Sequence, residues 1–451
     1  MRERWGLQER DASTRVLRVG ANREKMDMPG ACHLRGLIPS AALTLAALLG
    51  GACSSEGSRP SGTYLDDAAY RRSSLEASLV NPTNAYSALR LSHYEASGAR
   101  AWQNLPEWNP RAEIVGAGEL DAAGGVHPNA VLGSGARALV TEGIRGDDAL
   151  RALGEEAFFR YPMQLAPSFG AATTSRAEAK RYGLWVDDAR GVNGLLRVEL
   201  ADGTRALAIT CASCHARRDA DTFIIGVGNN AQDLGLLLAE ATAGTDNELV
   251  ARLQSWGPGR VDVTTHQAIE PVRIPDLRPT RWLTHLHHDA TVAQRDLTSL
   301  AIRIETLIIT SHGQVLRPPR EVALGLATYL WSLSASVEGR VPVSDAEQRG
   351  ADLFIKSCAS CHAPPSFTGP PVPLDVVGTD PLIGRSSDRG TGFYRVPSLH
   401  GVSTRGLLLH DASIKSLDAL FDPARTIPGH RFGLDLDASA RASLLAYLRT
   451  L

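Results

Sequence analysis

The sequence predicts a mainly α-helical protein whose C-terminal two thirds contain two copies of one structural unit. Four features of the 451-residue chain recur in the same order. Each copy has a glycine four residues before a phenylalanine, then the pentapeptide Cys-Ala-Ser-Cys-His, then His-Asp-Ala-Ser/Thr, and finally a helical segment with a matching apolar pattern. Repeated features in a fixed order indicate repeated units, so we expect two similar domains related by a pseudo-twofold axis.

The composition is that of a folded protein, with 43% hydrophobic and 21% charged residues. The 47 basic and 49 acidic side chains give a net charge of −2. This balance provides no positive field for a nucleic-acid backbone, so nucleic acid is not expected as a partner. No uninterrupted apolar stretch reaches the roughly 20 residues of a membrane-spanning helix.

The N-terminal residues 1–52 are predicted to be an export signal that starts at Met26 or Met28, since a basic region precedes an apolar core and small residues. The segment ends at Cys53 in Leu-Leu-Gly-Gly-Ala-Cys, which resembles a bacterial lipoprotein processing site. We therefore expect a lipid on Cys53, a tether over residues 53–62, and a protein anchored on the periplasmic side of the outer membrane. Ordinary cleavage, which would leave Cys53 as an unpaired thiol, is the alternative.

The two pentapeptides predict two covalently bound c-type haems, because Cys-x-x-Cys-His is the attachment signature of that cofactor. The thiols add to the two haem vinyl groups, and the histidine becomes the proximal iron ligand. The residues concerned are Cys211, Cys214 and His215 in the first motif and Cys358, Cys361 and His362 in the second. A zinc site made of the four cysteines would leave both histidines unexplained. A thioredoxin-like pair would need a βαβ context that is not predicted here.

The remaining elements are predicted from local signals. Residues 63–150 form an irregular N-terminal extension, residues 151–335 a first haem domain, and residues 336–451 a second. Alternating apolar residues on both sides of Asp202-Gly203 predict a small β-hairpin insertion in the first domain.

Two helices of the second domain have clear start signals. Ser344-Asp-Ala-Glu347 is a capping box that opens the helix running into the second motif. Asp437 is the expected N-cap of the C-terminal helix, whose apolar stripe comprises Leu444, Leu445, Leu448 and Leu451.

The ordered set of motifs over residues 151–451 resembles the bacterial di-haem cytochrome c peroxidase and MauG superfamily. The set comprises Leu153-Gly154, Phe158-Phe159, the haem motifs 147 residues apart, Val396-Pro-Ser-Leu399 and His410-Asp411. The resemblance implies two cytochrome c-like domains packed face to face, often in a homodimer. It also implies that one haem has an open iron face for peroxide, while the other receives electrons from a small donor protein.

Several positions depart from the family pattern. Ala424 stands where the family has a distal methionine, and His288-Asp289-Ala290 replaces Trp-Asp-Gly between the haems. Arg405-Gly-Leu407-Leu replaces the segment linked in the family to an interhaem calcium, so calcium is not expected. Glu305 is the acid nearest to the family's catalytic glutamate.

The distal ligands decide whether each iron can react. For haem 2 we favour His430, in the turn that follows the vacated methionine position, over His400, His410, Tyr394 or an open face. For haem 1 the resemblance implies an open or water-occupied face, with His285, His287, His288 and His312 as available ligands. Glu305 and His312 are the expected catalytic, proton-transferring groups. The histidines of residues 284–289 also permit a zinc site.

The sequence thus predicts an exported di-haem c-type cytochrome that transfers electrons and reduces peroxide or oxidises a substrate at haem 1. A non-catalytic electron carrier with both irons six-coordinate is the alternative. Oxygenase chemistry on an apolar polymer is a third possibility. The expected partner of the protein is a small electron-donor protein in the periplasm.

Overall fold

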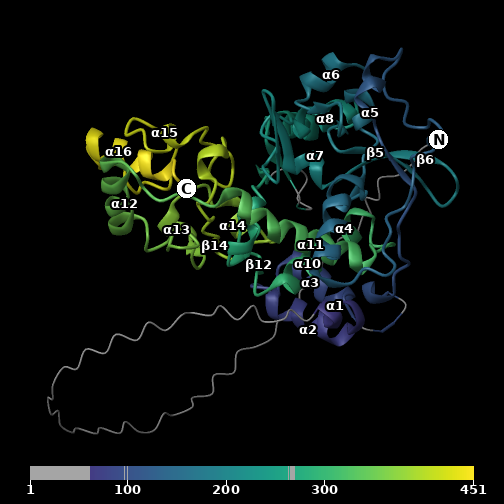
Figure 1. Cartoon of the computed structure of the whole chain (residues 1–451), viewed down its shortest axis with the longest axis horizontal. Helices are drawn as coiled ribbons and strands as arrows, with labels where there is room; N and C mark the ends of the chain where they lie inside the picture. Colours follow the sequence, from purple (N-terminus) through teal and green to yellow (C-terminus); the bar gives the residue numbers. More distant parts are fainter. Residues whose placement is uncertain (1–60, 96, 99, 263, 265–269) are drawn as a thin grey trace, which may run out of the picture. The chain divides into compact units, whose positions relative to one another are not determined.

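The computed structural model describes residues 61–451 apart from 96, 99, 263 and 265–269 (Figure 1). Residues 1–60, which include the predicted export signal, Cys53 and most of the predicted tether, lie outside the described residues. Within the described ranges, no helix has both the length and the apolar character needed to cross a membrane.

The first repeated feature is a tightly packed helix pair, α4 (Gly146–Arg160) with α11 (Arg320–Ser332). A β-carbon on Gly154 would lie 1.9 Å from the carbonyl oxygen of Gly325, so only glycine permits this approach of the two backbones. One turn later, Phe158 packs edge-on against Tyr329 with ring centroids 5.6 Å apart.

The second domain repeats this pair with α12 (Asp345–Ser357) and α16 (Ala438–Leu448). A β-carbon on Gly350 would lie 2.0 Å from the carbonyl oxygen of Ser443, and Phe354 packs against Tyr447 at 5.4 Å. The same glycine, phenylalanine and tyrosine contacts therefore recur in both halves of the chain. The pseudo-twofold axis itself stays a prediction.

The predicted start signals of α12 and α16 are confirmed. The Ser344 hydroxyl accepts from the backbone N–H of Glu347, and the Glu347 carboxylate accepts from the backbone N–H of Ser344. Asp437 accepts from the backbone N–H of Ala440. These bonds satisfy amide groups that have no partner inside a helix.

The N-terminal extension is more regular than predicted, since it contains α1 (Ser61–Asp66), α2 (Ala68–Ser78) and α3 (Ala85–His93). Asp67 and Asn84 cap the second and third helices through their side chains. Helix α2 contacts α10 (Leu297–Ser311), so the extension packs on the segment predicted to be the first haem domain (Figure 1).

The predicted hairpin is confirmed as β5 (Leu195–Glu199) paired with β6 (Arg205–Ile209), with Asp202 accepting from the backbone N–H of Thr204 in the turn. It forms the centre of a four-stranded antiparallel sheet in the order β1-β5-β6-β2, with β1 (Ala112–Ile114) and β2 (Gln164–Leu165) at the edges. The sequence did not predict these edge strands, because each is only two or three residues long.

The other elements are short. The remaining helices are α5 (Phe169–Ala172), α6 (Arg176–Arg181), α7 (Cys211–His215), α8 (Leu234–Ala241), α9 (Asn247–Gln254), α13 (Leu374–Val377), α14 (Leu382–Arg385) and α15 (Leu417–Leu420). The paired strands are β3 (Val186–Asp187) with β4 (Gly191–Val192), β7 (Ala216–Asp219) with β8 (Thr222–Ile225), β9 (Arg260–Val261) with β10 (Val272–Arg273), β11 (His285–Leu286) with β12 (Val292–Ala293), and β13 (Val372–Pro373) with β14 (Phe393–Tyr394).

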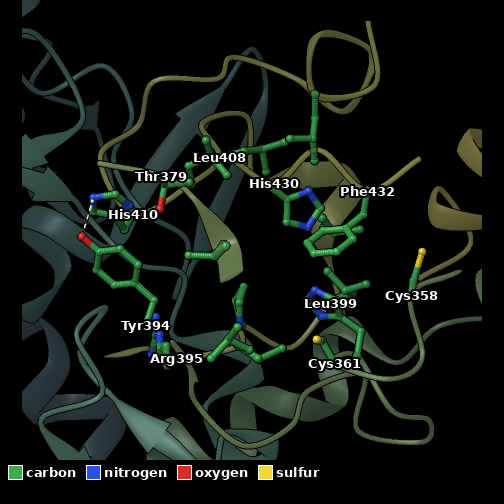
Figure 2. A pocket seen from close by; sticks show the side chains of 18 of the residues that line it. Cys358, Cys361, Thr379, Tyr394, Arg395, Leu399, Leu408, His410, His430 and Phe432 are labelled. Carbon is green, nitrogen blue, oxygen red and sulfur yellow. Dashed lines mark hydrogen bonds between the residues drawn. The ribbon is translucent and has the colours of Figure 1, made fainter. Parts of the chain in front are cut away.

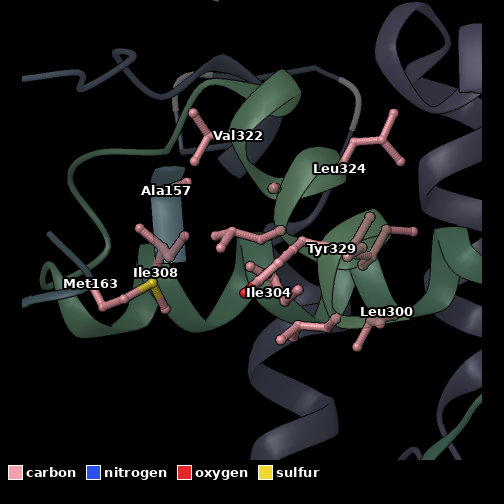
Figure 3. Close-up of a cluster of buried hydrophobic side chains, with 14 of the residues drawn as sticks. Ala157, Met163, Leu300, Ile304, Ile308, Val322, Leu324 and Tyr329 are labelled. Atoms are coloured by element: carbon pink, nitrogen blue, oxygen red, sulfur yellow. The ribbon is translucent and has the colours of Figure 1, made fainter. Parts of the chain in front are cut away.

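Each Cys-x-x-Cys-His motif adjoins the hydrophobic core of its own domain. The first core joins α4, α10 and α11 through residues such as Ala157, Ile304 and Tyr329 (Figure 3), and Cys211 packs against it. The second core joins α12 to α16, and Cys358 packs against it. Met163 is also buried in the first core (Figure 3).

Candidate haem sites

The second motif opens into a cavity that is lined mainly by apolar side chains (Figure 2). Cys358, Cys361 and His362 follow directly after α12 and form part of its wall. The apolar lining includes Phe354, Val372, Val377, Leu399, Leu408, Leu420 and Phe421. An apolar cavity beside two free thiols fits a porphyrin that is attached through its vinyl groups.

His362 has the hydrogen bonding of a proximal iron ligand. Its Nδ1–H donates to the carbonyl oxygen of Phe367 over 3.1 Å, which leaves the Nε2 lone pair available. Burial lowers the pKa of His362 to about 4, so the imidazole is neutral at physiological pH. A neutral imidazole is the form that binds a metal.

His430 also lines this cavity, and its ring centroid lies 6.4 Å from that of His362 (Figure 2). Two imidazoles that bind on opposite sides of one metal ion, each with a metal–nitrogen distance of about 2.0 Å, have their ring centres about 6 Å apart. Burial lowers the pKa of His430, which keeps this ring neutral as well. The two side chains therefore fit the axial positions of one haem.

The turn that carries His430 is held by Arg425. Its guanidinium donates to the carbonyl oxygens of Gly429 and His430 over 2.7 and 2.6 Å, and also to those of Leu420 and Ile427. His430 has a left-handed φ of 44°, and a β-carbon on Gly429 would lie 2.4 Å from the side chain of Thr379. The backbone of the turn that carries His430 is thus held by Arg425 and by the close approach of Gly429 to Thr379.

The other residues predicted as ligands of haem 2 are engaged elsewhere. His400 stacks on Trp282 at 3.9 Å, and its Nε2–H donates to the carbonyl oxygen of Pro365. The hydroxyl of Tyr394 donates to the carbonyl oxygen of Asp380 and lies 3.2 Å from Nε2 of His410, on which its ring stacks. Of the four side chains, His430 is the one placed opposite His362.

The first motif forms the short helix α7, whose histidine repeats the pattern of the second. The Nδ1–H of His215 donates to the carbonyl oxygen of Pro275 over 3.0 Å, and burial lowers its pKa to about 4. Burial raises the pKa of Cys211 and that of Cys214 to about 12, so both sulfurs are neutral thiols. Trp185 fixes α7 by donating its indole N–H to the carbonyl oxygen of Ala212.

Glu305 and His312 lie in α10 and at its C-terminal end, respectively. Glu305 is fully buried, accepts hydrogen bonds from the hydroxyls of Tyr64 and Tyr94 over 3.0 and 2.7 Å, and lies 3.5 Å from Arg320. His312 donates to the carbonyl oxygen of Pro162 over 3.2 Å. No contact found among the described residues joins either side chain to the first motif.

The remaining histidines predicted for haem 1 occupy the segment before α10. The Nε2 atom of His287 accepts a hydrogen bond from Arg303. Arg303 lies within electrostatic range of Cys211 and His215, so this guanidinium is close to the first motif. His288 donates from Nε2 to the carbonyl oxygen of Arg273 over 2.9 Å, and Nδ1 of His285 contacts the hydroxyl of Thr284.

The zinc alternatives receive no support from the arrangement of side chains. Over the part of the chain that the structure describes, no three His, Cys, Asp or Glu side chains are grouped to hold a metal ion. Cys53, the predicted lipidation site, lies outside that part.

The sequence analysis overlooked the buried arginines between the two motifs. Arg273, Arg395 and Arg405 line the cavity of the second motif. They come from β10 and from two loops, and no local pattern marks them, because only the tertiary fold brings them together.

No family model matches the chain, and no curated protein matches it. Three solved structures are similar to it. A MauG-like protein associated with microbial copper homeostasis is 17% identical, with a TM-score of 0.27 over 43% of this chain and 79% of the other. The hydrazine synthase of Kuenenia stuttgartiensis is 16% identical, with a TM-score of 0.33 over 71% and 98%. The diheme peroxidase BthA from Burkholderia thailandensis is 16% identical, with a TM-score of 0.33 over 77% and 94%.

Proposed function

We propose that this protein is an exported di-haem c-type cytochrome that passes electrons between two covalent haems and acts as an oxidoreductase at haem 1. The observation that carries the proposal is the arrangement at each motif. In both, a buried neutral histidine uses Nδ1–H on a backbone carbonyl and keeps Nε2 free beside two free thiols. When bound, haem supplies an iron that changes oxidation state and reacts with peroxide if one axial position is open.

His362 and His430 would both hold the iron of haem 2. An iron held by two imidazoles would bind no further molecule, so this haem would store and pass electrons. The apolar lining would keep water away from the cofactor. The low dielectric that results would influence the redox potential of the iron.

The residues around haem 1 support a different role. His215 is the proximal ligand, and we propose that the opposite face is open or holds water. Arg303 and its hydrogen-bond partner His287 place a positive charge and an imidazole near the first motif. We propose Glu305 and His312 as the groups that transfer protons at haem 1. A carrier with both irons six-coordinate is the second candidate, and it is favoured by the imidazole of His287, which lies near the first motif through its bond with Arg303.

The cellular setting belongs to the same proposal. The apolar segment before Cys53 supports export, with a lipid on that thiol that anchors the protein to the outer membrane on its periplasmic side. A small electron-donor protein in the same compartment would reduce haem 2. The resemblance also supports a homodimer.

Haem attachment is tested by expressing the chain together with a cytochrome c maturation system. The pyridine haemochrome spectrum and the intact mass should show two haems per chain. Cys361→Ala and Cys214→Ala should each prevent one haem from attaching through two thioether bonds, whereas Cys53→Ser should leave both haems in place. A wild-type chain without covalent haem would contradict the proposal.

A further inference from the structure

The wall between the two motifs is strongly cationic. Arg273, Arg395 and Arg405 line the cavity of the second motif and also a smaller cavity that Asp276 shares. Asp276 directly follows Pro275, the residue whose carbonyl oxygen accepts from His215. These arginines therefore lie between His215 of the first motif and the cavity of the second motif.

Among the described residues that line these two cavities, Asp276 is the only carboxylate, and it already has hydrogen-bond partners. Asp276 accepts two hydrogen bonds from Arg278, over 3.0 and 2.7 Å, and one from Nε of Arg405 over 3.3 Å. Arg405 also donates to the carbonyl oxygens of Ser398 and His400. Two guanidinium groups thus share the hydrogen bonds of Asp276, which acts on Arg273 and Arg395 through its charge alone.

Arg395 is the least satisfied of these groups. Its backbone N–H donates to the carbonyl oxygen of His288, but its Nε atom is buried without a hydrogen-bond partner among the described residues. Burial, and then the charge of Arg405, lower the pKa of Arg395 to about 10. Arg273 donates from Nε to the carbonyl oxygen of Leu409 over 3.0 Å, and burial followed by Arg405 and Arg395 lowers its pKa to about 9.

The charges of Asp289 and Asp276 reach Arg395, but neither carboxylate accepts a hydrogen bond from it. A buried guanidinium without a hydrogen-bonded anion is costly, because its N–H groups lose their hydration without a replacement. A carboxylate is the ligand that suits it best, since the planar fork of N–H groups accepts both oxygens at once. The unpaired Nε of Arg395 therefore indicates a carboxylate at this position in the loaded protein.

The place of Arg395 in the cavity identifies that carboxylate. In haem, the two vinyl groups lie at one edge of the porphyrin and the two propionates at the opposite edge. Cys358 and Cys361 stand on one side of the cavity, and Arg395 stands across it beside Tyr394 (Figure 2). A haem attached to the two cysteines would direct its propionates towards Arg395.

We propose that Arg395, supported by Arg273, is the binding site for a propionate carboxylate of haem 2. The inference rests on the proposed function, because it needs a haem at Cys358 and Cys361. It adds a charge for the propionate that the Cys-x-x-Cys-His motif does not supply. The positive charge also disfavours the ferric state, which carries one more positive charge than the ferrous state, so it raises the midpoint potential of haem 2.

The test compares haem-loaded wild-type protein with Arg395→Gln in a spectroelectrochemical titration, after the haem content of each has been measured. We expect the variant to keep two haems and the potential of haem 2 to fall. The ferric-to-ferrous ratio at a fixed potential should rise about tenfold, which is 59 mV for a one-electron couple. Arg385→Gln removes the same charge from an exposed position of α14 and should leave the potential unchanged.

Three further arms separate the alternatives. Arg395→Lys should restore most of the potential, because it restores the charge. If Arg395→Gln does not retain haem, Arg273→Gln should show the same fall in potential. Neither a chelator nor added acetate should change the wild-type potential. A fall with the chelator would mean that a divalent cation binds the propionates, and a fall with acetate would mean that the arginines bind a free carboxylate.

Each remaining outcome has one meaning. An unchanged potential in haem-loaded Arg395→Gln would overturn this inference and leave the proposed function standing. A wild-type protein without haem would overturn both.

Discussion

The ring centroids of His362 and His430 lie 6.4 Å apart at the cavity of the second motif, a separation that suits two ligands on opposite sides of one iron atom. The two residues are far apart in the chain, and the turn that carries His430 has a left-handed backbone. A backbone conformation that is unfavourable for a non-glycine residue indicates that the surrounding structure maintains it.

Replacing His430 by alanine should convert haem 2 from low spin to high spin and raise its midpoint potential. The second imidazole stabilises ferric iron more than water does, so its loss favours the ferrous state. Electron paramagnetic resonance and a redox titration measure both effects. His127→Ala, at an exposed position, is the matched control. A variant whose spectrum and potential match those of the wild type would leave His430 as a residue of the turn only.

Replacing Arg425 by glutamine should loosen the His430 turn without removing the ligand. Four backbone carbonyls lose their shared donor, so we expect a mixture of low-spin and high-spin haem 2. Arg431→Gln, exposed in the same turn, should keep the low-spin signal complete. If Arg425→Gln is as fully low spin as the wild type, the backbone alone suffices to position His430.

Replacing Gly154 or Gly350 by alanine should destabilise the protein by about 1–3 kcal/mol, because the new methyl group forces apart two packed helices. The added β-carbons would lie 1.9 and 2.0 Å from carbonyl oxygens. Urea unfolding measures the loss. Gly118→Ala should be tolerated, since its β-carbon would meet nothing within 4 Å. Equal stability of all three variants would show that the two helix pairs have room for a methyl group at Gly154 and Gly350.

Replacing Tyr94 by phenylalanine should cost about 1–3 kcal/mol, because it removes a hydrogen bond to a buried carboxylate. Glu305 would keep only the hydroxyl of Tyr64 and the charge of Arg320. We expect stability and peroxide turnover both to fall while the haem spectra stay unchanged, because the Tyr94 hydroxyl holds the carboxylate that we propose to transfer protons. Unchanged peroxide turnover at lowered stability would mean that Glu305 anchors the extension and has no catalytic role.

Local signals in the sequence predicted the features that depend on neighbouring residues. The hairpin at Asp202-Gly203 and the Ser344 capping box are of this kind. The Tyr94–Glu305 bond and the position of Arg395 could not be predicted, because each joins segments that only the tertiary fold brings together. The helices at residues 61–93 were missed because their N-caps, Asp67 and Asn84, stand in a segment without a strong apolar pattern.

Electron paramagnetic resonance of the oxidised, haem-loaded protein, recorded with and without hydrogen peroxide, distinguishes a catalytic haem 1 from an electron carrier. We expect one low-spin signal from the haem bound by His362 and His430, together with one high-spin ferric signal from the haem bound by His215. Peroxide should abolish the high-spin signal and leave a reductant-sensitive product. Two low-spin signals that peroxide does not change would contradict catalysis and identify the protein as an electron carrier.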